Sequence, residues 1–166
     1  MTTMENLAAA FAGESQANRK YLAFAKKAEE DGLHQVAKLF RAAAEAETIH
    51  AHAHLRAMGG IKTTLENLET AVEGELHEFK EMYPGFLEQA KEEGNKKAEF
   101  SFAYALAVEE IHHGLYEKAL ASVKDGKDLP GVAVYVCPVC GNTVEGRAPD
   151  MCPVCSVPGK KFFEIS

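Results

Sequence analysis

This sequence of 166 residues lacks any run of about 18 or more apolar residues, which excludes an ordinary membrane-spanning helix. Basic residues are too few to balance the acidic ones, since 18 lysines and arginines stand against 25 aspartates and glutamates. The net charge of −7 argues against nonspecific nucleic-acid binding, so no nucleic-acid or membrane partner is expected. Residues 1–6 lack the basic start and apolar core of a signal peptide, and the expected location is the cytoplasm.

Cysteine is absent before Cys137, and all four cysteines lie between Cys137 and Cys155. A secreted disulfide scaffold would distribute its cysteines more widely, so that class is excluded. The cysteines form two Cys-x-x-Cys pairs, Cys137 with Cys140 and Cys152 with Cys155. This arrangement is typical of one metal ion held tetrahedrally by four thiolates, and it suits either iron or zinc.

Four helical stretches are predicted before the cysteines from the apolar periodicity and the glycines that end each one. They run from about residue 4 to 31, 34 to 58, 65 to 93 and 95 to 124. Pro84 falls inside the third stretch and should kink it.

The amino-acid composition changes after the fourth predicted helix. Residues 126–133 are polar and contain glycine and proline, so they predict a linker. Short strands are expected at 132–136 and 161–165. The predicted organisation is therefore an all-α bundle over residues 1–125, the linker, and a small β and loop metal module over 134–166.

Each predicted helix carries a glutamate on its apolar face, where an unpaired charge is costly. The four are Glu14, Glu47, Glu75 and Glu109. A histidine follows two of them by three residues, which places both side chains on one side of a helix turn: His50 after Glu47 and His112 after Glu109. Lysine and arginine are absent from these faces, so a pair of metal ions is the direct way to balance the charge.

This ligand set is the one found in ferritin-like di-iron four-helix bundles, where two helices give one glutamate and two give Glu-x-x-His. The fold class predicted is therefore a ferritin-like four-helix bundle followed by a small four-cysteine metal module, which the resemblance described next implies to be rubredoxin-like. The alternative is four amphipathic helices with accidental polar positions. Tyr21 and Tyr83 follow Glu14 and Glu75 by seven and eight residues, and each either hydrogen-bonds a ligand carboxylate or only packs.

Nearly the whole chain resembles the rubrerythrin family. The motifs that carry the resemblance are Gly13-Glu14-Ser15, Glu47-Thr-Ile-His50, Gly74-Glu75-Leu-His-Glu78, Met82-Tyr-Pro-Gly-Phe86, Glu109-Glu-Ile-His112 and the four cysteines. The resemblance implies a non-haem peroxidase that reduces hydrogen peroxide to water. It also implies electrons from a reduced pyridine nucleotide, delivered through a rubredoxin or a reductase.

The resemblance implies the ligands as well. Two irons in a carboxylate-bridged pair would be held by Glu14, Glu47, His50, Glu75, Glu78, Glu109 and His112. Glu78, the extra carboxylate, would exchange with His50 on one iron as the oxidation state changes. A third iron would occupy a rubredoxin-type site at the cysteines. Asn142 stands where rubredoxins usually have an aromatic residue and Ser156 where glycine or alanine is common, so zinc in this module stays open.

Three other functions stay open from the sequence. One is a ferroxidase or iron-handling role, which would give the cysteine module no task. Another is an electron carrier or zinc-stabilised binding protein, which would leave the glutamates on the apolar faces unexplained. The third is reduction of oxygen in place of peroxide, which would use the same parts.

The chain geometry predicts a homodimer. His112 lies about 18 Å before the end of its helix, so the cysteine site is expected far from its own chain's iron pair, with a head-to-tail partner bringing it close. The link between the second and third helices also looks short for a ferritin-like crossover. It reaches about 20–25 Å where about 27 Å is needed. A domain swap, in which the last two helices pack on the first two of another chain, is therefore a further expectation.

Overall fold

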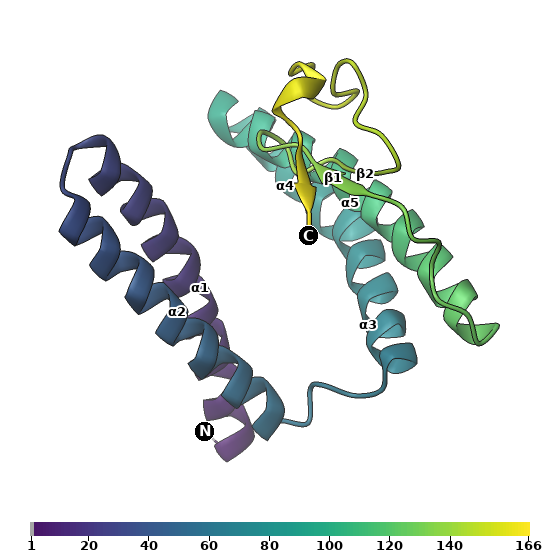
Figure 1. Ribbon diagram of the computed structural model, residues 1–166, viewed down its shortest axis with the longest axis horizontal. Coiled ribbons are helices and arrows are strands. Elements are labelled where there is room, and N and C mark those ends of the chain that lie inside the picture. Colours follow the sequence, from purple (N-terminus) through teal and green to yellow (C-terminus); the bar gives the residue numbers. More distant parts are fainter. Residues whose placement is uncertain (1) are drawn as a thin grey trace. The chain divides into compact units, whose positions relative to one another are not determined.

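The computed structural model describes residues 2–166, which divide into two compact units. The first unit ends at Lys62 and the second spans Thr63–Ser166 (Figure 1). Among the described residues, no helix is both long enough and apolar enough to cross a membrane.

The first unit is a hairpin of two long helices, α1 (Thr3–Glu30) and α2 (His34–Ala57) (Figure 1). A capping box starts α1, because the Thr2 side chain accepts from the Glu5 backbone N–H and Glu5 reaches back to Thr2. The buried side chains at the contact are mainly small, which lets the two helices approach closely. They are Asn18, Ala25 and Ala28 in α1, with Ala37, Ala44 and Ala51 in α2.

The second unit begins with a long helical segment built from α3 (Thr64–His77), η1 (Glu78–Met82) and α4 (Tyr83–Glu92). This segment packs against α5 (Lys96–Lys124). Thr63 and Glu66 form a second capping box at the start of α3. The side chain of Asn95 accepts the Ala98 N–H at the start of α5.

The segment η1 is π-helical and ends two residues before Pro84, the residue at which the sequence analysis predicts a kink. Proline has no N–H and its ring crowds the carbonyl four residues earlier, so a regular α-helix could not continue through this point. The wider π turn resolves the conflict, with the Tyr83 N–H bonding the Glu78 carbonyl five residues back.

The π turn also explains an irregularity in the internal repeat. An offset of 62 residues relates Tyr21, Phe24, Phe40, Glu47 and His50 to Tyr83, Phe86, Phe102, Glu109 and His112. Residues before the π turn are offset by 61 instead, as in Glu5 and Glu66, Gly13 and Gly74, and Glu14 and Glu75. The π turn lies between Glu75 and Tyr83, and it absorbs the one extra residue of the second half.

The cysteine module folds as a three-stranded antiparallel sheet of order β2-β1-β3. Its strands are β1 (Val134–Val136), β2 (Thr143–Glu145) and β3 (Phe163–Ile165), with a 3₁₀ turn η2 (Gly159–Lys161) before the last. The strands predicted near 132–136 and 161–165 are confirmed in shortened form, whereas β2 was missed. Strand β2 reads Thr-Val-Glu and has a single apolar residue, so it lacks the apolar residues that marked the other two strands.

The predicted fold class is confirmed: four-helix bundle elements precede a small C-terminal β module with a four-cysteine cluster. The domain boundaries at residues 125 and 134 stay a prediction.

Candidate metal centres

The first candidate metal group lies in the α1–α2 hairpin and consists of Glu14, Glu47 and His50. His50 Nδ1 lies 3.0 Å from Glu47 Oε2 and 4.0 Å from Glu14 Oε1. The pKa of Glu14 is raised above its ordinary value, first because its carboxyl shares a hydrogen bond with that of Glu47. Two acids and an imidazole thus converge on one point of the helix pair.

The second group repeats this arrangement in the α3–α5 pair with Glu75, Glu109 and His112. His112 Nδ1 lies 2.8 Å from Glu109 Oε2 and 3.9 Å from Glu75 Oε2. Burial, followed by the hydrogen bond and charge of Glu109, raises the pKa of Glu75 to about 7. Carboxylates brought together in this way are unfavourable as bare charges and favourable as ligands of a cation.

The ligand atoms of each group lie within 4.8 Å of one another, and carboxylate oxygens with imidazole nitrogen suit iron. The two Glu-Glu-His groups therefore fit the two halves of a di-metal site. The six residues predicted from the sequence fall into these two groups, three in each helix pair.

Glu78 and Tyr83 lie beside the second group but outside its close cluster. The pKa of Glu78 is raised by burial and by the nearby charge of Glu109. The pKa of Tyr83 is raised by burial and by Glu78, Glu109 and Glu75. Glu78 begins the π turn, which sets its direction relative to Glu75 on the preceding helix turn.

The two tyrosines pack in matching aromatic clusters. The Tyr21 ring lies 6.4 Å from Phe24 and 6.1 Å from Phe40, and the Tyr83 ring lies 6.1 Å from Phe86 and 6.3 Å from Phe102. Packing between aromatic rings is therefore enough to explain the positions of both tyrosine rings. A role of either hydroxyl on a ligand carboxylate stays a prediction.

The four cysteines converge at the edge of the small sheet. Cys137 Sγ lies 3.6 Å from Cys155 Sγ, and Cys140 Sγ lies 3.5 Å from Cys152 Sγ. Four sulfurs at about 2.3 Å from a tetrahedral ion would be about 3.8 Å apart, so the cluster is close to the size that a metal requires. The two knuckles are built alike, since Gly141 N–H bonds Cys137 O and Ser156 N–H bonds Cys152 O.

The module lies against α5 through β2 (Figure 1). His112 Nε2 is 3.0 Å from Thr143 Oγ1, and Lys118 pairs with Glu145 of the same strand. The expectation that the cysteine site lies far from its own chain's ligands is therefore wrong for this half. The chain turns back after α5, where the Ser122 hydroxyl bonds the carbonyls of Lys127 and Asp128.

Thr143 holds one side of the His112 ring through a hydrogen bond to Nε2. The single hydroxyl proton of Thr143 is donated to the Gly141 carbonyl at 3.1 Å. With that proton so placed, the Nε2–H of His112 is the donor to Thr143, and a metal ion at Nδ1 would replace the present contact of 2.8 Å between Nδ1 and Glu109 Oε2. Sequence reasoning missed Thr143, because nothing in a single sequence brings residues 31 apart together.

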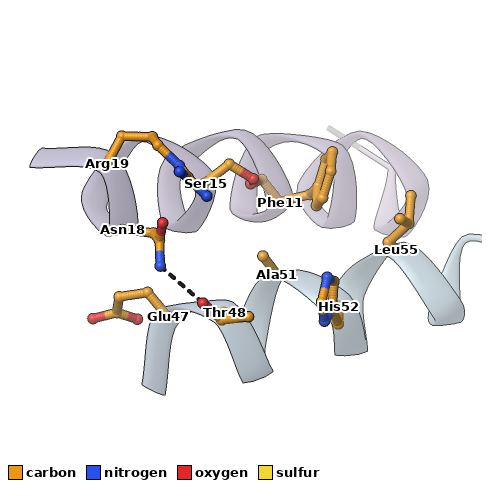
Figure 2. Close-up of a pocket in the computed structure, with 9 residues that line it drawn as sticks. All are labelled: Phe11, Ser15, Asn18, Arg19, Glu47, Thr48, Ala51, His52 and Leu55. Carbon is orange, nitrogen blue, oxygen red and sulfur yellow. Dashed lines mark hydrogen bonds between the residues drawn. The ribbon is translucent and has the colours of Figure 1, made fainter. Parts of the chain in front are cut away.

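The first group also borders a cavity of about 220 Å³ in the hairpin, lined by Glu47 on one side (Figure 2). Asn18 points from α1 toward α2 there and donates to the Thr48 hydroxyl at 2.8 Å and to the Ala44 carbonyl at 2.7 Å. This buried amide ties the two helices together next to Glu14 and Glu47.

Comparison with known proteins identifies the chain. Residues 5–120 match the rubrerythrin family, and residues 135–163 match the rubredoxin-like domain of rubrerythrin. The chain belongs to the rubrerythrin family. Rubrerythrins are redox proteins, and this one carries di-iron-like carboxylate and histidine groups and a four-cysteine site.

Full-length relatives agree with this assignment. Rubrerythrin-2 of Clostridium acetobutylicum is 38% identical over 96% of this chain and 95% of its own length. Nigerythrin of Nitratidesulfovibrio vulgaris is 37% identical over 97% of this chain and 85% of its own. A solved structure of fully reduced, all-ferrous nigerythrin has a TM-score of 0.59 at 34% identity, covering 99% of this chain and 87% of that one.

Proposed function

We propose that this rubrerythrin-family protein is a peroxidase that reduces hydrogen peroxide to water at a carboxylate-bridged di-iron pair. Reduction of one peroxide to two waters takes two electrons and two protons. The electrons would come from a reduced pyridine nucleotide through a rubredoxin or reductase partner and enter at the four-cysteine site. The observation that carries the proposal is the hydrogen bond between His112 and Thr143, because it joins the electron-transfer module to a di-iron ligand.

The bound iron pair would supply two electrons and Lewis acidity to the O–O bond. The protein's own part is to hold the pair and to balance its charge. Glu14, Glu47, Glu75 and Glu109 would supply four carboxylates, and His50 and His112 would supply imidazole nitrogens. Thr143 holds the Nε2 side of the His112 ring, so that Nδ1 faces the carboxylates of Glu75 and Glu109.

Glu78 is proposed as the carboxylate that exchanges with His50 as the oxidation state changes. Its place at the start of the π turn supports this role, because a π turn is a common device at functional helix positions. Glu78→Ala should then slow peroxide turnover. Glu81→Ala is a matched control, because Glu81 lies in the same turn and pairs with exposed His77. Full activity in Glu78→Ala would remove Glu78 from the reaction.

The function is tested by mixing fully reduced, iron-loaded protein with hydrogen peroxide in the absence of air. Fast return of the ferric-thiolate colour, with peroxide consumed, is expected because both centres react and are connected. Peroxide left unconsumed would contradict the proposal. A parallel experiment with dissolved oxygen separates an oxidase, which would react faster with oxygen, from a peroxidase.

We further propose that a complete di-iron site requires two copies of the chain, each of which contributes one of the two Glu-Glu-His groups. In a ferritin-like bundle the link from α2 to α3 must return along the bundle axis. Glu47 lies ten residues before the end of α2 and Glu75 eleven after the start of α3, so the link must span about 31 Å. The seven steps from Ala57 to Thr64 reach at most about 25 Å.

The shortfall favours a domain-swapped homodimer, in which the hairpin of one copy meets the α3–α5 pair of the other. A head-to-tail contact is then not required to bring the four-cysteine module to a ligand group, because the module already lies on its own α5.

Complementation tests the swap. Glu47→Ala and Glu109→Ala chains are each expected to be inactive, because each loses a ligand from both sites of its homodimer. A swapped heterodimer of the two keeps one intact site, so random co-assembly should restore about a quarter of the wild-type activity. No recovery in a mixture that contains the heterodimer would show that each chain closes its own site.

A further inference from the structure

Asn142 occupies an unusual position for an amide side chain. It follows Gly141 of the first knuckle and precedes β2, and its side chain is only 1% exposed. Burying an amide costs free energy unless its polar atoms are hydrogen-bonded. A residue of this kind in the core of so small a module requires a physical explanation.

The contacts of Asn142 reach three of the four cysteines. Its carbonyl accepts the Cys137 N–H at 2.9 Å, and its own backbone N–H lies on the Cys140 sulfur. Its side-chain Nδ2 lies 3.7 Å from Cys152 Sγ. The backbone contacts would persist with any residue here except proline, whereas the contact to Cys152 requires the amide.

The side-chain contact has a definite polarity. A metal-bound thiolate only accepts hydrogen bonds, so the NH₂ end of the amide faces the sulfur. The Oδ1 atom of Asn142 is buried, and it has no hydrogen-bond partner in the part of the chain that the structure describes. Burying Oδ1 without a partner therefore costs folding free energy. The side-chain hydrogen bond that accompanies this cost is the one from Nδ2 to the Cys152 sulfur.

We propose that Asn142 raises the reduction potential of the iron at the four cysteines by donating a hydrogen bond to Cys152. The inference rests on iron in this site, as in the proposed function. Four thiolates with ferric iron carry one negative charge, and with ferrous iron they carry two. A donor pointed at sulfur stabilises the more negative, reduced form, and hydrogen bonds to the sulfurs are among the factors that set such potentials.

Cys152 is suited to this control because other donors already converge on it. The backbone N–H groups of Val154 and Cys155 also hydrogen-bond its sulfur. The Asn142 amide adds a donor from the opposite knuckle. The effect is a bias toward the reduced state in the site that receives electrons first.

The first test is a redox titration of iron-loaded protein, followed by the ferric-thiolate colour. Asn142→Leu keeps the volume and removes the N–H donor. At the solution potential that half-reduces the wild type, we expect its ferrous-to-ferric ratio to fall about threefold to tenfold, where tenfold corresponds to about 59 mV for one electron. Asn142→Asp, which turns a negative oxygen toward sulfur, should lower the ratio further.

Asn18→Leu is the matched control, because Asn18 is another buried amide with an unpartnered Oδ1 but lies in the hairpin. It should leave the potential of the four-cysteine iron unchanged. An unchanged or raised potential in Asn142→Leu would overturn the proposal and leave Asn142 a packing residue.

A second measurement does not depend on a variant's folding. In wild-type protein with ¹¹³Cd in the four-cysteine site, a scalar coupling is expected between the cadmium nucleus and a side-chain amide proton of Asn142, carried by the N–H···S bond. Absence of that coupling would also overturn the proposal. Neither measurement uses peroxide, so a failure of the proposed peroxidase activity is seen separately.

Discussion

The two helix pairs carry the same three candidate ligands at equivalent places, but among residues 2–166 the structure shows a hydrogen bond from outside the pair only to the histidine of the second. His50 in the hairpin is 55% exposed and bonds Glu47 through Nδ1. His112 is 27% exposed, and Thr143 of the four-cysteine module holds the other side of its ring. The comparison teaches that the four-cysteine module orients the ligand histidine of the second pair, whereas His50 contacts the ligand carboxylates of its own hairpin.

The largest expected effect removes this support by disrupting the module. A Cβ atom on Gly159 would lie 1.6 Å from the Pro149 carbonyl oxygen, a backbone atom that cannot move aside cheaply. Gly159→Ala should destabilise the module by about 3 kcal/mol or more and abolish its ferric-thiolate colour. Gly13→Ala is the control, since nothing lies within 4 Å of its added Cβ. A normal colour and thermal melt in Gly159→Ala would contradict this account of the packing.

A smaller change removes only the hydroxyl that touches His112. Thr143→Val should weaken metal binding at the carboxylate site about 10- to 100-fold, because the ring loses the partner that fixes its tautomer. Thr143→Ser should bind nearly as the wild type, and Thr70→Val, which alters an exposed hydroxyl of α3, serves as the control. Titration with ferrous or cobaltous ion measures the change. Equal affinity in Thr143→Val would mean that the two helix pairs do not differ in support.

The smallest expected effect compares the two knuckles of the module. Gly141 has φ +84° and Ser156 has φ +59°, so serine stands in the left-handed region that favours glycine. Ser156→Gly should therefore stabilise the zinc-loaded module by about 0.5–1 kcal/mol, and Gly141→Ser should destabilise it by a similar amount. Denaturant unfolding measures both, and a destabilised Ser156→Gly would contradict the strain.

Much of the site could be predicted from the sequence because its ligands follow local rules. Spacing of three places Glu47 beside His50 and Glu109 beside His112 on any α-helix, and the structure keeps both pairs in contact. The four-cysteine metal site could also be predicted from the sequence, since two knuckles with this spacing need a common ion. Contacts between residues far apart in the sequence could not be predicted. Thr143, for example, lies 31 positions after His112 and contacts its ring.

The helix pairs, the ligand types and the four-sulfur cluster were determined by the sequence itself, because helix periodicity and chelate spacing depend only on neighbouring residues. Tertiary structure decided how Pro84 is accommodated. The π turn before it avoids the clash of a regular α-helix while Tyr83 and Phe86 pack on Phe102 of α5. It also decided where the module lies and which sulfur receives the Asn142 amide. These outcomes depend on which surfaces meet once the chain folds back, and contacts between distant residues have no fixed sequence spacing to reveal them.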